Sequence, residues 1–137
     1  IIINKGSKHK INLGMVVIDG EYLVGKIVEV NYSSSRVLLL SDLNSKIPVI
    51  VEPNTVFSIL SGTGKDYGII QYSKKYEDIK NESVIYTSGA GSLFKAGIPI
   101  GRMNINNLSD EKKVDFFSDF SQLKFVKVVS FKKSENK

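Results

Sequence analysis

At positions 87–101 the chain reads TSGAGSLFKAGIPIG, which places four glycines in fifteen residues without a helical period. Short apolar runs lie on both sides, at 84–86 and 98–105. Glycine adopts positive φ angles that other residues resist. The stretch therefore predicts a strand that ends at Thr87, a glycine-rich turn closed by the apolar pair 93–94, and a second turn into a new strand. Such a pattern specifies backbone shape more than side-chain chemistry.

The size and composition of the chain are those of a small globular protein. Its 137 residues suffice for one domain or two very small ones. It contains no apolar run of about eighteen residues that would span a bilayer, and no signal peptide. Because it begins at Ile1 and not at a methionine, we expect it to be a piece of a longer protein. The absence of cysteine excludes disulfides, thiolate metal sites and cysteine nucleophiles.

Short strands account for most of the sequence. Apolar runs alternate with turn residues at intervals of about eight to twelve residues, which gives about ten to twelve strands. This spacing is typical of β-sandwiches and β-barrels. Since no long amphipathic helix is present, a doubly wound α/β fold is not expected. Gly25 lies inside the predicted strand 22–32 and indicates a bulge or a sharp bend.

The best candidate for a domain boundary is the turn Glu52-Pro53-Asn54. It divides the chain into a first domain, 1–54, and a second domain, 55–131, which is followed by a charged tail at 132–137. The last predicted strand, 123–131, could belong to the second domain or could return to complete the first.

Two serines in the glycine-rich stretch, Ser88 and Ser92, raise the question of a nucleophile. The elbow pattern Gly-x-Ser-x-Gly is absent, and an active serine needs a general base. The single histidine, His9, stands among lysines in a polar turn, which favours a solvated surface residue. With one histidine and no cysteine, a transition-metal site is not expected. We predict no catalytic residue, no metal site and no cofactor, with a degenerate serine hydrolase kept as an alternative.

The loop Ser61-Gly62-Thr63-Gly64-Lys65 shares some features with a phosphate-binding loop. That motif needs a further glycine five residues before the glycine of its Gly-Lys pair, and a Ser or Thr after the lysine. Here Ile59 and Asp66 occupy those two positions, and an aspartate would repel phosphate. We therefore predict a hairpin loop.

The net charge of +5 makes nucleic acid an alternative partner. Lysine doublets occur at 74–75, 112–113 and 132–133. Tyr67, Tyr72 and Tyr76 flank the first doublet, and small barrels bind nucleic acid through basic grooves with interleaved aromatic side chains. Only two of the nineteen basic residues are arginine, however, and arginine is the residue that reads bases.

Tyr22, Tyr32, Tyr72 and Tyr86 lie on predicted strands with apolar neighbours. Such apolar strand surfaces, together with open sheet edges, favour a protein-binding module over a nucleic-acid-binding one.

Several motifs, in order along the chain, resemble those of the rod shape-determining protein MreC family. The signature residues in the opening stretch are Thr87, Ser88, Gly89, Gly91, Phe94, Gly97, Ile98, Pro99, Ile100 and Gly101. They are similar to the family's Thr-Ser-Gly, Gly, Phe-Pro and Gly-Ile-Pro-Ile-Gly pattern, except that Lys95 replaces the first proline. Further similarities lie at 4–17, 24–30, 33–42 and 62–64.

The resemblance implies an all-β fold of two small six-stranded-type β-barrels packed in tandem. The second barrel would be similar to a chymotrypsin-like half-barrel without its catalytic residues. The signature residues would then have a structural role, and the protein would not be an enzyme.

The resemblance also implies a periplasmic scaffold of the bacterial cell-elongation machinery, which organises peptidoglycan synthases. The scaffold would be attached to the inner membrane through a single helix that lies outside this sequence. The implied partners are the elongation-specific class B penicillin-binding transpeptidase, MreD, RodA and the MreB machinery, together with a second copy in a homodimer or filament. Nucleic acid is not among them.

Overall fold

The computed structural model describes residues 1–71, 79–90, 95–105 and 111–130. The strands are β1 (Ile2–Ile3), β2 (Val16–Asp19), β3 (Tyr22–Val30), β4 (Ser35–Leu39), β5 (Lys46–Glu52), β6 (Val56–Gly62), β7 (Tyr67–Gln71), β8 (Val84–Thr87), β9 (Pro99–Ile105), β10 (Lys112–Phe116) and β11 (Lys127–Val129). A short 3-10 turn, η1 (Ser7–His9), precedes β2. Within the described ranges, no helix has the length and apolar character needed to cross a membrane.

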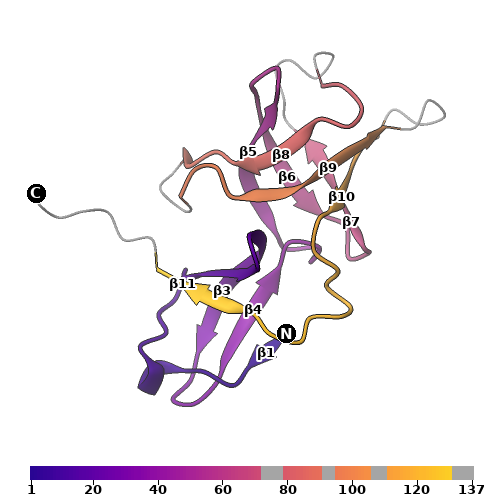
Figure 1. Cartoon of the computed structure of the whole chain (residues 1–137). Helices are drawn as coiled ribbons and strands as arrows, with labels where there is room; N and C mark the ends of the chain where they lie inside the picture. Colours follow the sequence, from indigo (N-terminus) through magenta and orange to yellow (C-terminus); the bar gives the residue numbers. More distant parts are fainter. Residues whose placement is uncertain (72–78, 91–94, 106–110, 131–137) are drawn as a thin grey trace, which may run out of the picture.

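The strands form two antiparallel sheets (Figure 1), which confirms the all-β prediction. The first sheet has the order β1-β4-β3-β2-β11, and the second is a closed barrel with the order β10-β7-β6-β5-β8-β9. The barrel has the six strands predicted for the second unit. The first sheet has five strands and stays open, because β1 and β11 lie at its two edges.

The sheets divide the chain differently from the predicted domain ranges at strand β5, and they assign the last strand, whose place the sequence left open. Strand β5 lies inside the range 1–54 but belongs to the barrel, where it pairs with both β6 and β8. The turn Glu52-Pro53-Asn54 is therefore part of the β5–β6 connection within the barrel. Strand β11 returns to the first sheet and pairs with β2, in the register Val128↔Val17. The ranges 1–54 and 55–131 stay a prediction about independent folding units.

One apolar core joins the two sheets. The barrel interior is filled by inward side chains such as Val49 and Ile85, which alternate with outward residues along each strand. Val16, Leu23 and Leu40 of the first-sheet segment belong to the same buried cluster. The first sheet adds a smaller cluster of its own on its other side. The position of the barrel on the first sheet is therefore held by shared burial.

Polar and aromatic contacts at the junction add to this shared core. The Ser118 hydroxyl, just after β10, donates a hydrogen bond to the Asp19 carboxylate at the end of β2 (2.5 Å). The Tyr22 ring lies 5.0 Å from the Phe117 ring, and the Arg102 guanidinium stands 5.7 Å from the centre of the same ring. These contacts connect the β2–β3 hairpin to the barrel strands β9 and β10.

The predicted irregularity near Gly25 is confirmed. The β2–β3 register shifts between Val17, which faces Gly25, and Ile18, which faces Leu23, so that Val24 is the additional residue of β3. A Cβ atom at Gly25 would collide with the backbone carbonyl of Leu38 on β4. Glycine at this position therefore allows β3 and β4 to approach closely beside the bulge.

Candidate functional site

The signature stretch closes the connection between β8 and β9. Thr87 is completely buried at the end of β8. Its hydroxyl donates a hydrogen bond to the Lys95 carbonyl (2.5 Å) and accepts one from the Ile98 amide (2.9 Å). Its backbone amide donates to the Ile98 carbonyl (3.0 Å), and its carbonyl accepts from the Gly97 amide (2.9 Å). One threonine thus connects the outgoing strand to the returning one.

The other turn residues of the signature support the same connection. Gly89 and Gly97 have positive φ angles of 77° and 88°, which glycine adopts at little cost. The Ser88 amide donates a hydrogen bond to the Pro48 carbonyl (3.4 Å), and its hydroxyl accepts one from the Ala90 amide (3.1 Å). The predicted turn and plug residues Gly91 and Phe94, together with Ser92, lie outside the described residues.

The last four signature residues lead into strand β9, which begins at Pro99, directly after Ile98. Ile98 and Ile100 point into the buried cluster of the barrel, and Pro99 pairs with Tyr86 across the β8–β9 ladder. A Cβ atom at Gly101 would collide with the backbone carbonyl of Asp115 on β10. These residues shape the barrel and present no polar group for chemistry.

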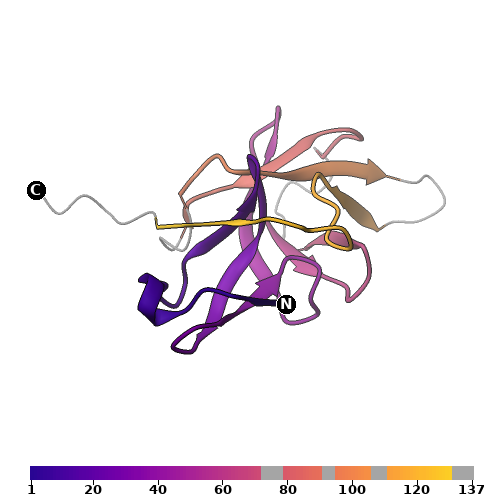
Figure 2. The ribbon, with the colours of Figure 1, turned by 60° about the horizontal axis from the view of Figure 1, so that its bottom comes forward.

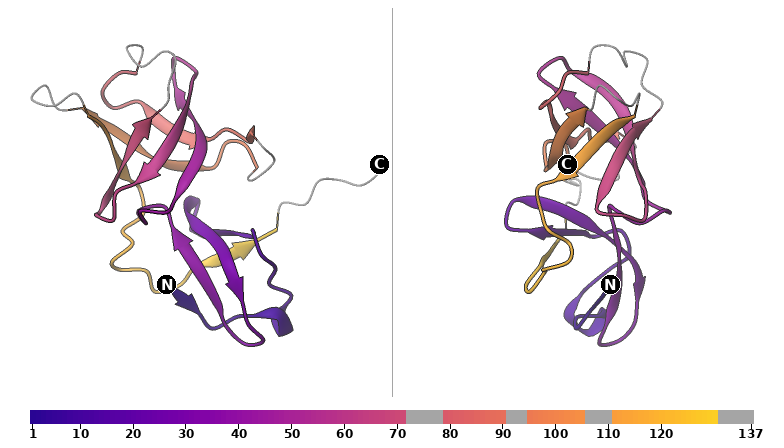
Figure 3. Two further views of the ribbon diagram at one scale, coloured as in Figure 1. Left: turned by 180° about the vertical axis from the view of Figure 1, so that it is seen from behind. Right: turned by 90° about the vertical axis from the view of Figure 1, so that its right-hand side faces the viewer.

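The structure does not bring Ser88 and His9 together. Ser88 follows β8 of the barrel, whereas His9 lies in η1 at the end of the first sheet that points away from the barrel (Figure 3). The His9 Nδ1 atom accepts a hydrogen bond from the Gly6 amide (3.1 Å). In the part of the chain that the structure describes, no group of three or more His, Asp and Glu side chains could hold a metal ion.

The loop that shares features with a phosphate-binding loop is a hairpin, as predicted. It joins the antiparallel strands β6 and β7. The Thr63 hydroxyl donates to the Tyr67 carbonyl (2.7 Å), and the Gly64 amide donates to the Ser41 carbonyl (2.7 Å). The loop therefore uses its polar groups to pack against the β4–β5 connection.

An open groove of about 710 Å³ runs along the outside of the barrel, beside the signature turn. Its lining residues are Ile50, Glu52, Pro53, Thr55, Tyr86, Thr87, Ser88, Ala96 and Gly97. They come from the end of β5, the β5–β6 turn, the end of β8 and the chain that returns to β9. Three signature residues, Thr87, Ser88 and Gly97, thus line one side of the groove.

A row of apolar side chains crosses the outer face of the barrel at this groove. Ile50 on β5 faces Tyr86 on β8 and Phe57 on β6, and all three side chains point outward, because their neighbours Val49, Val51, Val56 and Ile85 are buried inside. We call Tyr86, Ile50 and Phe57 the outer apolar row. Phe57 is 64% exposed, which is unusual for so large an apolar side chain and marks a surface suited to a partner.

The sequence identified only part of this surface. Tyr86 was among the tyrosines expected on apolar strands, but Phe57 and Ile50 were missed. The available signal was that β5 and β6 carry apolar residues at both parities, at 47–51 and 56–60. In a barrel strand only one face can enter the core, so apolar residues at both parities predict apolar side chains on the outer surface.

The residues proposed for nucleic-acid binding do not form a described patch. Tyr72, Tyr76 and the lysine doublet 74–75 lie outside the described residues. Tyr67 lies beneath the Lys113 ammonium, 4.1 Å from the ring centre. The face of this ring is therefore occupied by a cation from the neighbouring strand.

Comparison with known proteins gives consistent matches along almost the whole chain. The family model "Rod shape-determining protein MreC, barrel core" matches residues 1–130. The cell shape-determining protein MreC of Caulobacter vibrioides is 30% identical over 131 residues, which cover 96% of this chain and 38% of that protein. A crystal structure of MreC from Pseudomonas aeruginosa superposes with a TM-score of 0.85 at 29% identity, covering 95% of this chain and 88% of that one.

A more distant structural match is a solved complex between Penicillin-Binding Protein (PBP2) and MreC from Helicobacter pylori. It has a TM-score of 0.60 at 16% identity, covering 77% of this chain and 67% of that one, and shows a shared fold. The chain spans less than half the length of the curated relatives that it matches.

Proposed function

Since the chain belongs to the rod shape-determining protein MreC family, we propose that it is a non-catalytic scaffold of the bacterial cell-elongation machinery. In this role it organises peptidoglycan synthases and so maintains cell shape. It works at the periplasmic face of the inner membrane, with the membrane helix supplied by a part of the protein outside this sequence. MreD, RodA, the MreB machinery and a second copy of the chain are further proposed partners.

The observation that carries this proposal is the outer apolar row beside the open groove. Phe57 supplies a large and mostly exposed aromatic side chain, and aromatic residues are frequent anchors of protein interfaces. The row spans three hydrogen-bonded strands and borders a groove of about 710 Å³. Such a surface suits a protein segment better than a small substrate, because small-molecule sites enclose most of their ligand.

The proposed occupant of this surface is the class B penicillin-binding transpeptidase of elongation. Support comes from the solved complex between Penicillin-Binding Protein (PBP2) and MreC from Helicobacter pylori, whose MreC chain shares this fold. Binding would place an apolar segment of the transpeptidase across Tyr86, Ile50 and Phe57. The scaffold would then hold its partner in position without taking part in transpeptidation.

The binding test compares two exposed phenylalanines by titration calorimetry with the periplasmic part of the transpeptidase. Phe57→Ala removes an anchor and is expected to weaken binding about tenfold or more. Phe125→Ala is the matched control, since Phe125 is 88% exposed and lies next to β11, in the first sheet. Equal affinities of the wild type and the Phe57 variant would contradict the proposed surface, and so would a loss seen only with the Phe125 variant.

The absence of catalysis is tested at Ser88. Its hydroxyl accepts a hydrogen bond from the Ala90 amide, and the single histidine of the chain lies on the other sheet. We expect no labelling of the wild-type chain by a fluorophosphonate probe of active serines. Labelling that disappears in Ser88→Ala would overturn the scaffold-only function.

A further inference from the structure

The end of the first sheet that points away from the barrel is formed by two turns. These are the segment 5–10, which contains η1, and the β3–β4 turn at 31–34. The Ser7 amide donates to the Asn31 carbonyl (2.8 Å), and the Lys8 amide donates to the Tyr32 carbonyl (3.0 Å). We call these two segments the distal tip. Figure 2 shows them side by side at the edge of the molecule.

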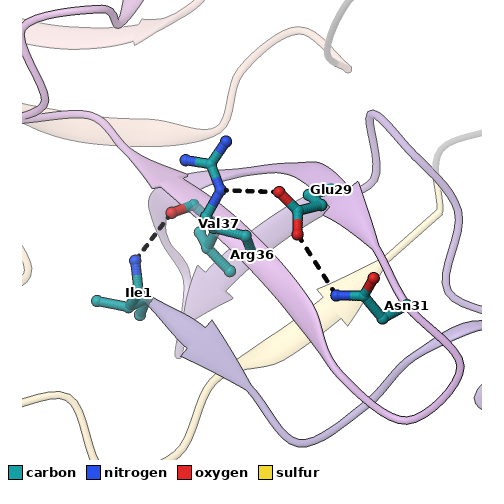
Figure 4. A network of polar contacts seen from close by, with 5 residues as sticks. All are labelled: Ile1, Glu29, Asn31, Arg36 and Val37. Atoms are coloured by element: carbon teal, nitrogen blue, oxygen red, sulfur yellow. Dashed lines mark hydrogen bonds and ion pairs between the residues drawn. The ribbon is translucent and has the colours of Figure 1, made fainter.

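The distal tip carries a concentrated positive charge. Lys5, Lys8 and Lys10 are all exposed, and no acidic residue occurs in the chain before Asp19. Glu29 lies next to the tip on β3, but its carboxylate is bound by Arg36 (3.4 Å) and by the Asn31 side-chain amide (3.4 Å) (Figure 4). The charge of Glu29 is therefore offset by arginine and does not neutralise the lysines.

The lysines of the distal tip affect the charge of His9, and one of them contacts an aromatic ring. Desolvation lowers the pKa of His9, and the positive charges of Lys5 and then Lys8 lower it further. A positive charge on His9 is therefore disfavoured, so the charge of the tip comes from its lysines. The Lys8 ammonium also stands 5.4 Å from the centre of the Tyr32 ring, which is 71% exposed. An aromatic ring is therefore presented together with the charges.

We propose that the distal tip binds the surface of a lipid bilayer that contains anionic headgroups. Lysine is a compact, strongly hydrated charge that is drawn to anionic bilayers without needing a specific geometry. Tyrosine is enriched at membrane–water interfaces, where its ring enters the headgroup layer and its hydroxyl stays in water. A turn at the end of a sheet is also convex and can reach a flat surface.

These features favour a bilayer over nucleic acid. Nonspecific binding of single strands uses a basic groove with several aromatic rings for successive bases. The distal tip offers one exposed tyrosine ring, that of Tyr32, and the smaller imidazole of His9, which is too few rings to stack a series of bases. Bilayer binding at this end would leave the outer apolar row on the barrel open for a protein partner.

The test is co-sedimentation with two kinds of vesicle, one of equal parts phosphatidylglycerol and phosphatidylcholine, the other of phosphatidylcholine alone. The tip variant is Lys5→Gln/Lys8→Gln/Lys10→Gln. The matched control, Lys65→Gln/Lys80→Gln/Lys124→Gln, changes three exposed lysines elsewhere and leaves the same net charge. All substituted side chains are exposed, and thermal unfolding is expected to be unchanged in both variants.

We expect binding to the anionic vesicles that weakens with added salt and is absent with phosphatidylcholine alone. Each lysine near an anionic surface contributes about fivefold, so the tip variant is expected to lose well over tenfold in partition coefficient. The control variant should keep most of the binding, and Tyr32→Ser should lose a few-fold.

Several outcomes would overturn the proposal. Equal losses in the tip and control variants would mean that only net charge matters. Binding to phosphatidylcholine alone at the same level would remove the role of the anionic headgroup. Full competition by millimolar inorganic phosphate would indicate a phosphate site on the protein. Tip-dependent binding of a single-stranded oligonucleotide without vesicle binding would indicate nucleic acid. None of these outcomes depends on whether the chain binds a transpeptidase.

Discussion

At the scale of single residues, two glycines of the signature are required for different reasons. Gly101 leaves no room for a side chain, because a Cβ atom would meet the Asp115 carbonyl on the adjacent strand. At Gly97 a Cβ atom would have no neighbour within 4 Å, but the φ angle is 88°, which residues other than glycine resist. Their substitution by alanine therefore separates a steric cost from a conformational one.

We predict that Gly101→Ala lowers the free energy of unfolding by about 2–3 kcal/mol, as expected for overpacking against backbone that cannot move freely. Gly97→Ala should cost only about 1 kcal/mol, the cost of a left-handed residue with a Cβ atom. Urea unfolding followed by circular dichroism measures both values. Equal costs for the two variants would show that the β9–β10 ladder can open to accept a methyl group.

The sequence predicted that these glycines shape the backbone, because a high density of glycine indicates turns with positive φ angles. The sequence could not show why glycine is needed at each position. The φ angle is a local property, but the contact with the Asp115 carbonyl depends on the register in which β10 pairs with β9. The exposure of Phe57 was hidden for a similar reason. Alternation shows that a strand has two faces, but only the closed barrel determines which face lies outside.

At the scale of elements, the β8–β9 connection depends on one side chain. The Thr87 hydroxyl both donates to Lys95 and accepts from Ile98, in a buried position. A backbone amide that loses its partner when buried costs about 1–3 kcal/mol. The connection should therefore be sensitive to loss of the hydroxyl and tolerant of loss of the methyl group.

We predict that Thr87→Val destabilises the chain by about 2 kcal/mol, because valine keeps the shape but leaves the Ile98 amide and the Lys95 carbonyl without this partner. Thr87→Ser should retain both hydrogen bonds and more of the stability. The measurement is the urea midpoint together with amide hydrogen exchange at Ile98. Unchanged protection of that amide in Thr87→Val would argue against the role of the hydroxyl.

Individual strands were predictable from turn spacing and alternation, but their sheet membership was not. Strand β5 was expected in the first unit because the turn Glu52-Pro53-Asn54, which follows it, was the best candidate for a domain boundary. Its partners are β6, a near neighbour, and β8, whose residue Thr87 pairs with Val49. Nothing in the alternation of a strand identifies a partner so far along the sequence. The place of the final strand was left open for the same reason.

At the scale of the whole molecule, the shared core leads us to expect that the two sheets unfold as one cooperative unit. Leu40 follows β4, is 1% exposed and belongs to the buried cluster that continues into the barrel. Its amide also donates to the Val24 carbonyl of β3 (3.0 Å). A cavity at this position should therefore destabilise both the first sheet and the barrel.

We predict that Leu40→Ala costs about 3 kcal/mol, and that amides of β3 and of β8 lose exchange protection to the same extent. Val37→Ala, in the smaller cluster of the first sheet, is the comparison variant. Loss of protection confined to the first sheet in the Leu40 variant would mean that the two sheets unfold separately. That result would support the predicted ranges 1–54 and 55–131 as folding units.

The return of β11 to β2 means that the whole barrel is inserted into the sequence of the first sheet. During synthesis, strands β1 to β4 leave the ribosome before the barrel strands, and β11, which covers β2, leaves after them. Until Lys127 is available, the edge of β2 presents unpaired peptide groups, which are the kind that join foreign strands. A copy truncated before Lys127 would therefore keep the edge of β2 open to foreign strands, whereas a copy that contains β11 covers it.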